Sequence, residues 1–294
     1  MLPADWLRRF RGGWELERPL APRTTWRIGG PAELYIEPAS TEELLAALER
    51  LRRSGVAWRL LGGGSNLLVA DRGVRGAVLC LARLAALHRE GTTVVAEAGV
   101  RLSTLVRFAI REGLQGAEKL AGIPGCIGGA VFGNAGGRHG DIGGLVRFLD
   151  LLEPDGRLVR LAPPPGFFRY RHSDVRGRIV VRAELELREA DPREVCARTF
   201  AIIRERRKTQ PGWVGNAGCV FKNPPGHGAG RLIDTAGCKG MREGGVTVSE
   251  IHANFFENEG RATCADVERL VERVRDAVRR AHGVEMELEV RRWE

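Results

Sequence analysis

The chain has 294 residues, a length that predicts two or three compact lobes instead of a single small core. Hydrophobic residues make up 43% of it and charged residues 28%, the balance of an ordinary globular protein. No apolar run approaches the roughly 20 residues that span a bilayer, and the first residues contain no apolar signal core. We therefore expect a cytoplasmic protein without membrane insertion.

The formal net charge of +9 comes almost entirely from arginine. A positive excess can indicate a nucleic-acid-binding protein, but these arginines are spread along expected helices instead of forming a basic arm. No aromatic platform for stacking bases interleaves with them. We expect no nucleic acid partner, and the same positive field would favour a small polyanion such as a nucleotide diphosphate.

The six cysteines are scattered along the chain and form no C-x-x-C pair. In a chain of this size and expected compartment, neither a disulfide framework nor a structural metal site is predicted.

The first expected lobe spans residues 1–82 and contains strands and one helix. The helix is predicted over residues 41–55, because its leucines form one stripe at helical spacing and Gly55 can end it. The expected strands are residues 33–38, 57–61 and 76–81.

The second expected lobe spans residues 83–190 and includes a glycine-rich segment without periodicity at residues 121–144. A turn signal at Pro154-Asp155-Gly156 predicts a hairpin between two apolar runs. The expected regular elements are a strand at 92–99, a helix at 103–113, the hairpin at 148–162 and a strand at 178–189.

The third expected lobe spans residues 191–294, with helices predicted at 191–208 and 263–283. Each helix begins at a capping residue, Asp191 in one and Thr263 in the other. Residues 284–293 alternate and predict a terminal strand. The sequence of elements predicts the α+β class.

The first glycine-rich motif is Gly62-Gly63-Gly64-Ser65-Asn66, directly after an apolar strand. Glycines let the backbone approach a ligand without a Cβ clash, and successive N–H groups can converge on phosphate oxygens. The motif lacks the G-x-G-x-x-G spacing of a Rossmann fingerprint. Taken alone, it is equally well explained by a tight structural turn.

The second glycine-rich motif, residues 122–136, is a long irregular segment, and such a segment inside a compact domain is usually functional or disordered. Apolar residues between its glycines argue against disorder. Two such loops from adjacent lobes predict a dinucleotide held between them. The residues expected to contact it here are Gly122, Ile123, Gly125, Gly128, Gly129, Asn134 and Ala135.

Several motifs, in their order along nearly the whole chain, resemble those of the UDP-N-acetylenolpyruvoylglucosamine reductases. They are T-x-W-x-I-G-G at 24–30, LGGGSNLL at 61–68, AGIPGCIGGAVFGNAG at 121–136, YRHS at 170–173, AGCVFKNP at 217–224 and LEVR at 288–291. The resemblance implies a two-lobed FAD-binding fold of the vanillyl-alcohol-oxidase class, followed by a C-terminal α+β substrate-binding domain. The chain is similar to the shorter variety of this family.

The resemblance also implies a reaction. In this family NADPH reduces FAD, and the flavin then reduces UDP-N-acetylglucosamine enolpyruvate to UDP-N-acetylmuramate for peptidoglycan synthesis. Arg171 would stabilise the charge that develops on the substrate's carboxylate, and Glu289 would assist the same intermediate. Alternation places Glu285, Glu287 and Glu289 on one face, so the pattern alone does not choose among them.

Cys219 is a departure from the family pattern, because the usual A-G-S-V-F motif carries a serine proton donor at this position. A thiol has a reference pKa of about 8.5, so it is mostly protonated at neutral pH and can act as a general acid. An inert buried cysteine is the alternative.

The resemblance implies further contacts with the nucleotide sugar diphosphate, for which ammonium and amide groups are suited. The expected substrate contacts are Tyr170, Lys208, Lys222, Asn223 and Asn254. Within enzymes, the alternative is another flavin oxidoreductase of the same fold, such as an alcohol or sugar oxidase. Many of those attach flavin covalently through a histidine, and because neither glycine-rich motif contains one, we expect noncovalent FAD.

Overall fold

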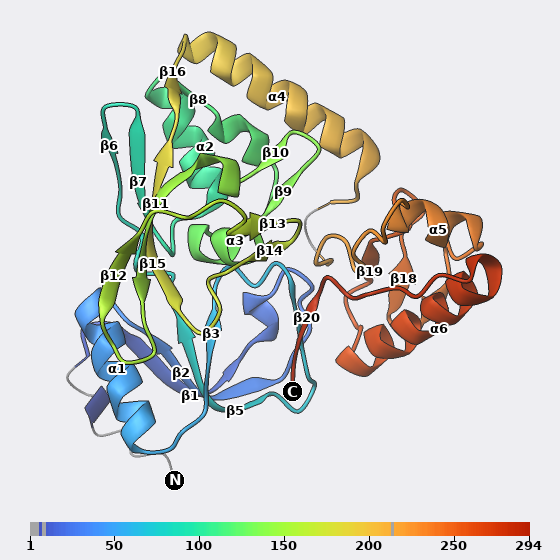
Figure 1. Cartoon of the computed structure of the whole chain (residues 1–294). Helices are drawn as coiled ribbons and strands as arrows, with labels where there is room; N and C mark the ends of the chain where they lie inside the picture. Colours follow the sequence, from blue (N-terminus) through green and yellow to red (C-terminus); the bar gives the residue numbers. More distant parts are fainter. Residues whose placement is uncertain (1–5, 8–9, 213–214) are drawn as a thin grey trace. The chain divides into compact units, whose positions relative to one another are not determined.

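The computed structural model describes residues 6–7, 10–212 and 215–294. These residues form two compact units, each built from several segments of the chain (Figure 1). The first unit contains the described residues up to Glu15 together with residues 34–63 and 77–206. The second contains residues 16–33, 64–76 and 207–294. The sequence instead predicts three lobes, with boundaries after residues 82 and 190. That division differs from these two units, and it stays a prediction.

One layer, most of whose residues belong to the first unit, combines a sheet with helix α1 (Thr41–Arg53). The sheet has the order β1-β2-β5-β3, with β1 (Gly13–Pro19), β2 (Pro31–Glu37), β5 (Val74–Cys80) and β3 (Trp58–Leu61). Ser40 caps the helix by accepting a hydrogen bond from the Glu43 N–H, and Leu44 and Leu51 pack into the hydrophobic core of this layer. Because β3 ends at Leu61, it leads directly into the first glycine-rich motif.

A five-stranded antiparallel sheet forms the other layer of the first unit, in the order β12-β11-β15-β7-β6. Its strands are β6 (Leu87–Glu90), β7 (Thr93–Glu97), β11 (Val146–Leu152), β12 (Leu158–Leu161) and β15 (Ile179–Glu186). Pairing of Leu152 with Leu158 confirms the hairpin that the Pro154-Asp155-Gly156 turn predicts.

Three helices complete this layer: α2 (Leu102–Arg111), α3 (Ile127–Gly133) and α4 (Pro192–Thr209). In α4 the Asp191 carboxylate caps the helix by accepting a 2.7 Å hydrogen bond from the Arg193 N–H, as the sequence predicts. Ile202 and Ile203 pack against the hydrophobic core of the sheet, so the helix expected to open a third lobe belongs mostly to the first unit.

Short elements connect these parts of the first unit. The strands are β8 (Leu114–Gln115), β9 (Gly136–Gly137), β10 (Gly140–Asp141), β13 (Phe168–Arg169), β14 (His172–Ser173) and β16 (Arg188–Glu189). The 3-10 helices are η3 (Ala117–Leu120) and η4 (Gly143–Leu145).

The second unit packs helix α6 (Cys264–His282) and helix α5 (Ala229–Thr235) around a core of its own. Its strands are β4 (Leu67–Val69), β17 (Arg242–Glu243), β18 (Val246–Val248), β19 (Phe256–Asn258) and β20 (Arg291–Trp293), and its 3-10 helix is η2 (Ala21–Arg23). β17, β18 and β19 form an antiparallel sheet. β20, near the end of the chain, pairs in parallel with β4, which directly follows the first glycine-rich motif.

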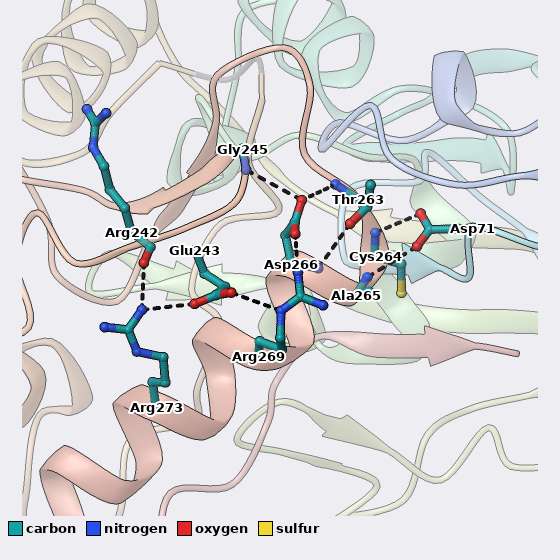
Figure 2. A network of polar contacts seen from close by, with 10 residues as sticks. All are labelled: Asp71, Arg242, Glu243, Gly245, Thr263, Cys264, Ala265, Asp266, Arg269 and Arg273. Atoms are coloured by element: carbon teal, nitrogen blue, oxygen red, sulfur yellow. Dashed lines mark hydrogen bonds and ion pairs between the residues drawn. The ribbon is translucent and has the colours of Figure 1, made fainter.

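The start of α6 is fixed by two carboxylates (Figure 2). Asp266 and Thr263 form a capping box in which each side chain accepts a hydrogen bond from the other residue's N–H. Asp71, from the loop after β4, accepts hydrogen bonds from the N–H groups of Cys264 at 2.8 Å and Ala265 at 3.2 Å. The helix therefore begins at Cys264, next to the predicted cap.

Two expectations about secondary structure are wrong. The glycine-rich segment at 121–144 is not wholly irregular, because it contains helix α3. The predicted terminal strand at 284–293 is regular only at β20, and before it Leu288 forms a single bridge with Phe221. Among the described residues, no helix combines the length and the apolar character that crossing a membrane requires.

Candidate active site

The two glycine-rich motifs meet within the first unit. A Cβ atom added to Gly63 would lie 2.6 Å from the Gly125 Cα atom, and one added to Gly62 would lie 3.0 Å from the Cys126 sulfur. A side chain at residue 63 would require the backbone to shift, so the close approach of the motifs depends on glycine. Gly125 also has a φ of +120°, which side chains rarely permit.

Backbone donors from both motifs converge beside Cys126, the residue before helix α3. Burial raises the pKa of the Cys126 thiol, and hydrogen bonds from the N–H groups of Gly129, Gly63 and Gly128 oppose that shift. These N–H groups are directed at the Cys126 sulfur, so this residue links the two motifs. Three of the residues expected to contact a dinucleotide therefore share one location.

The rest of the first motif belongs to the second unit. Gly64 has a φ of +63°, and a Cβ atom there would clash with the Arg23 carbonyl oxygen. Ser65 is half-buried and follows it. The exposed Asn66 side chain donates a 3.0 Å hydrogen bond from Nδ2 to the Glu289 carbonyl oxygen. The motif is thus bonded to the segment that carries Glu289.

Asn134 ends helix α3 with a left-handed φ of +43° and a side chain that is only 2% exposed. Its Oδ1 accepts a 3.0 Å hydrogen bond from the Gly143 N–H, and its Nδ2 donates one of 3.0 Å to the Arg169 carbonyl oxygen. Both the Oδ1 and the Nδ2 atom of Asn134 are therefore hydrogen-bonded within the protein. Contact between Asn134 and a dinucleotide stays a prediction, and the backbone of Asn134 is the part best placed to make it. Gly122, Ile123 and Ala135 are half-buried beside these loops.

Tyr170 and Arg171 form the two-residue turn between β13 and β14. Arg171 has a φ of +53°, a conformation that costs a residue other than glycine about 1–2 kcal/mol. Its guanidinium carbon lies 5.3 Å from the centre of the Tyr170 ring, within range of a cation–π interaction. A strained arginine held at a turn favours a functional role over that of a passive surface residue.

Cys219 and Glu289 lie on neighbouring segments of the second unit. The Glu289 N–H donates a 2.8 Å hydrogen bond to the carbonyl oxygen of Val220, the residue after Cys219. Both Cys219 and Glu289 are half-buried. The structure therefore brings together the two expected catalytic residues of this unit.

The structure also distinguishes Glu289 from the other two acids of its segment. Glu285 pairs with Arg279, and Glu287 pairs with Lys222, and both carboxylates are largely exposed. Exposed pairs of this kind are ordinary features of a protein surface. Glu289 is the most buried of the three, which favours it for a catalytic role.

Asn254 holds the Cys219 segment from the other side. Its backbone carbonyl accepts a 2.8 Å hydrogen bond from the Val220 N–H. Its side-chain Oδ1 accepts one of 2.9 Å from the Phe221 N–H, and Nδ2 donates one of 2.8 Å to the Phe221 carbonyl oxygen. The side chain is 1% exposed, so this geometry favours positioning of the Cys219 segment over direct contact with a substrate.

His252 supports Asn254, because the Asn254 N–H donates a 3.2 Å hydrogen bond to the His252 Nδ1 atom. Burial lowers the pKa of His252, which keeps the ring neutral and Nδ1 able to accept. This hydrogen bond gives His252 a structural role.

The remaining expected substrate contacts have different surroundings. Lys222 and Asn223 continue the Cys219 segment, and the Asn223 Oδ1 accepts a 2.9 Å hydrogen bond from the Ala229 N–H at the start of α5. Lys208 is exposed in the last turn of α4, and Tyr170 is 55% exposed. All four assignments stay predictions.

Two features of the structure are not predicted from the sequence: the binding of Asp71 to the start of α6, and the position of Cys126 between the two glycine-rich motifs. Asp71 binds the start of α6, 193 residues away in the chain, so no local pattern could identify its partner. The signal for Cys126 was available, since it lies between the glycines of the second motif, but its contact with Gly62 and Gly63 required the fold.

Models of known protein families match two parts of the chain. Residues 32–162 match an FAD binding domain, and residues 210–293 match the C-terminal domain of UDP-N-acetylenolpyruvoylglucosamine reductase. Individual relatives agree. The UDP-N-acetylenolpyruvoylglucosamine reductase of Heliobacterium modesticaldum is 46% identical, with 97% of this chain and 92% of its own length covered. That of Moorella thermoacetica is 47% identical, with 94% and 91% covered.

The structure is also similar to a solved one. The crystal structure of UDP-N-acetylenolpyruvylglucosamine reductase from Thermus caldophilus superposes with a TM-score of 0.83 at 38% identity, covering 97% of this chain and 99% of that chain. These matches confirm the expected FAD-binding fold followed by the C-terminal domain of the reductase family, and the mixture of helices and strands agrees with the expected α+β class.

Proposed function

Since the chain belongs to the family of UDP-N-acetylenolpyruvoylglucosamine reductases, we propose that it reduces UDP-N-acetylglucosamine enolpyruvate to UDP-N-acetylmuramate with NADPH as reductant. It is an FAD-dependent oxidoreductase of peptidoglycan precursor synthesis. The observation that carries the proposal is the match to such reductases over nearly the whole chain, FAD-binding and C-terminal domains together. Because NADPH and nucleotide sugars are small molecules of the bacterial cytoplasm, we assign the reaction to that compartment.

The residues of the glycine-rich motifs fit FAD. The backbone at Gly62 and Gly63 approaches Gly125 and Cys126 too closely to leave room for side chains, and N–H groups of both motifs converge beside Cys126. The backbone of Gly62, Gly63 and Gly129 is solvent-exposed, so a cofactor can approach it there without meeting a side chain. When bound, FAD supplies the hydride that adds to the terminal carbon of the substrate's enolpyruvyl double bond.

Arg171 and Glu289 act on the charge that this addition creates. The electron pair of the double bond moves toward the substrate's carboxylate, which gains negative charge. A planar guanidinium stabilises a carboxylate through directed, charge-assisted hydrogen bonds, and the turn at Arg171 holds this side chain in a strained conformation. Glu289 assists the same intermediate.

Cys219 donates the proton that completes the reduction. Its sulfur gives a proton to the carbon next to the ether oxygen, and the electron pair of the intermediate forms the new C–H bond. One hydride and one proton thus saturate the double bond, and the thiolate regains a proton from water. The hydrogen bond from Glu289 to Val220 supports this role, because it joins the Cys219 segment to that of another catalytic residue.

Lys222, Asn223, Lys208 and Tyr170 bind the nucleotide sugar. Ammonium and amide groups match diphosphate and hydroxyl oxygens, and the net charge of +9 attracts a substrate that carries several negative charges.

The proposal is tested by adding the enolpyruvyl nucleotide to the purified, flavin-containing protein with NADPH in the absence of oxygen. We expect loss of NADPH absorbance that depends on the nucleotide, and a product heavier than the substrate by two hydrogens. NADPH consumption that needs oxygen, ignores the nucleotide and yields hydrogen peroxide would instead identify an oxidase.

A further inference from the structure

Two asparagines of the glycine-rich motifs bind segments that carry catalytic residues instead of pointing into an open loop. In the first unit, Asn134 donates from Nδ2 to the Arg169 carbonyl oxygen at 3.0 Å, and Arg169 is the last residue of β13 before the turn with Arg171. Ser173, on the other strand of the same hairpin, donates from its hydroxyl to the Phe132 carbonyl oxygen of helix α3 at 2.9 Å. The Arg171 turn is therefore anchored to the second glycine-rich motif on both sides.

The second unit contains the corresponding arrangement. Asn66 donates from Nδ2 to the Glu289 carbonyl oxygen at 3.0 Å, and the Asn66 carbonyl accepts from the Arg291 N–H at 3.2 Å. The next residues of each segment pair as the parallel strands β4 and β20, with Leu67 opposite Arg291. The segment of Glu289 is therefore fixed to the first glycine-rich motif.

We propose that Asn134 and Asn66 are positioning residues for Arg171 and Glu289, and that they couple the shape of the flavin-binding motifs to the placement of these two catalytic side chains. The inference rests on the proposed function, since it takes the roles of Arg171 and Glu289 from it. Each asparagine acts within its own unit, so the two links are independent of each other.

The chemistry of the amide suits asparagine to residue 134. The amide presents an acceptor to the Gly143 N–H and a donor to the Arg169 carbonyl oxygen, and asparagine tolerates the left-handed φ of +43° better than most residues. Aspartate keeps the acceptor but turns the donor into an oxygen that faces a carbonyl oxygen. Asn134→Asp therefore breaks the bond to the Arg171 hairpin and preserves the bond to Gly143.

The experiment measures the two half-reactions of the FAD-loaded enzyme separately. In Asn134→Asp we expect full FAD content and an unchanged rate of flavin reduction by NADPH. Reoxidation by the enolpyruvyl nucleotide should slow by about 10- to 100-fold, the scale expected when a catalytic group is misplaced. Asn66→Ala should slow reoxidation to a similar extent through Glu289, with its FAD content measured alongside.

Double variants show whether each asparagine acts through its partner. When Arg171 is already alanine, adding Asn134→Asp should slow reoxidation by less than about 2-fold, because a positioning residue has nothing left to position. The same holds for Asn66→Ala combined with Glu289→Ala. A direct role in flavin binding or a general structural role would keep its full effect in the double variant.

A matched control is Asn258→Asp. Asn258 donates from Nδ2 to the Trp26 carbonyl oxygen and accepts from two N–H groups through Oδ1, so the substitution makes the same chemical change away from both catalytic segments. It should leave the ratio of the two half-reaction rates unchanged. If Asn134→Asp does not fold, Asn134→Gly, which keeps the left-handed backbone, takes its place.

The inference is overturned by loss of FAD from Asn134→Asp, by equal slowing of both half-reactions, or by full additivity with Arg171→Ala. Normal reoxidation in Asn134→Asp while Arg171→Ala is slow would reject this inference alone. Normal reoxidation in Arg171→Ala itself would instead contradict the catalytic role assigned under the proposed function.

Discussion

Cys219 is the proton donor of the proposed reaction, and a thiol differs in both acidity and chemical stability from the serine that the family resemblance implies at this position. Cys219→Ala should slow flavin reoxidation by about 100- to 10,000-fold, the usual contribution of general acid catalysis, and leave flavin reduction intact. Cys219→Ser should retain most activity, since a hydroxyl at the same place can also donate a proton. Rapid-mixing measurement of the two half-reactions tests this.

Oxidation distinguishes the thiol further. Peroxide should inactivate the natural protein through a sulfenic acid at Cys219, with protection by substrate and recovery in thiols, and the serine variant should resist it. Cys126 and Cys264 provide an internal comparison, because burial raises the pKa of both thiols and keeps them in the unreactive form. A fully active Cys219→Ala enzyme would assign the proton to another group.

The conformation of Arg171 separates its contribution to stability from its contribution to catalysis. Residue 171 has a φ of +53°, so Arg171→Gly relieves backbone strain that Arg171→Ala retains. The free energy of unfolding should therefore be about 1 kcal/mol higher for the glycine variant than for the alanine variant. Both should slow reoxidation by at least about 100-fold while NADPH still reduces the flavin. Urea unfolding and half-reaction kinetics measure the two effects. If the glycine variant kept full activity, the guanidinium would have no catalytic role.

At the scale of elements, the Asp266 carboxylate accepts a hydrogen bond from the Thr263 N–H at the start of α6 (Figure 2), and we expect this helix start to depend on its charge. The hydrogen bond from the Thr263 N–H holds the pKa of this carboxyl below its usual value. Asp266→Ala should lower the free energy of unfolding by about 1–2 kcal/mol at pH 7. Because the pKa is lower in the folded state, the stabilisation is present above the unfolded pKa of about 3.9 and disappears as the pH falls through the folded pKa.

Urea unfolding of the natural protein and of Asp266→Ala, from pH 7 down to the lowest pH at which both fold, checks this. The difference between their free energies of unfolding should shrink only at the acid end of this range. Asp276→Ala on the same helix is the control. Asp276 pairs with Arg279 on the surface, so its removal should change the free energy of unfolding by less than about 0.5 kcal/mol. An Asp266 effect that did not depend on pH would mean that packing, not charge, fixes the start of the helix.

The contact between the glycine-rich motifs makes a further prediction at this scale. Gly63→Ala places a Cβ atom 2.6 Å from the Gly125 Cα atom, so the motifs must separate. We expect FAD affinity to fall by at least about 10-fold and the free energy of unfolding to fall by about 1–3 kcal/mol. Gly133→Ala is the control, because open space surrounds Gly133 and alanine favours the helix there. Flavin fluorescence titration compares the two, and equal affinities would show that the motif contact is dispensable.

Across the whole molecule, the elements that the sequence predicts well are those with local signals. Helices α1, α4 and α6 combine an apolar stripe with a capping residue, and both features lie within the helix and its ends. The hairpin of β11 and β12 is similarly marked by its turn. These signals need no knowledge of distant residues.

The features that the sequence does not predict depend on partners far along the chain. Alternation at residues 284–290 does not become a strand, because this segment pairs mainly through single contacts with Val220, Phe221 and Lys222. The roles of Asn66, Asn134 and Asn254 were predicted as ligand contacts from motifs alone. Each of these side chains also forms a hydrogen bond with a distant residue: 223 positions away for Asn66, 35 for Asn134 and 33 for Asn254. Such partners can be identified only from the fold.

FAD should stabilise the protein without covalent attachment. Neither glycine-rich motif contains histidine, and His139, which borders the second one, lies with its Nε2 atom 3.1 Å from the Glu205 carboxylate. A ligand that binds only the folded state stabilises it by mass action, by about 2.7 kcal/mol at a free concentration 100 times the Kd. The melting temperature should therefore rise with added FAD in the natural protein and much less in Gly63→Ala. Acid denaturation should release the flavin into the supernatant. Flavin that stays with the precipitated protein, or a melting temperature indifferent to FAD, would contradict a noncovalent site built from these two motifs.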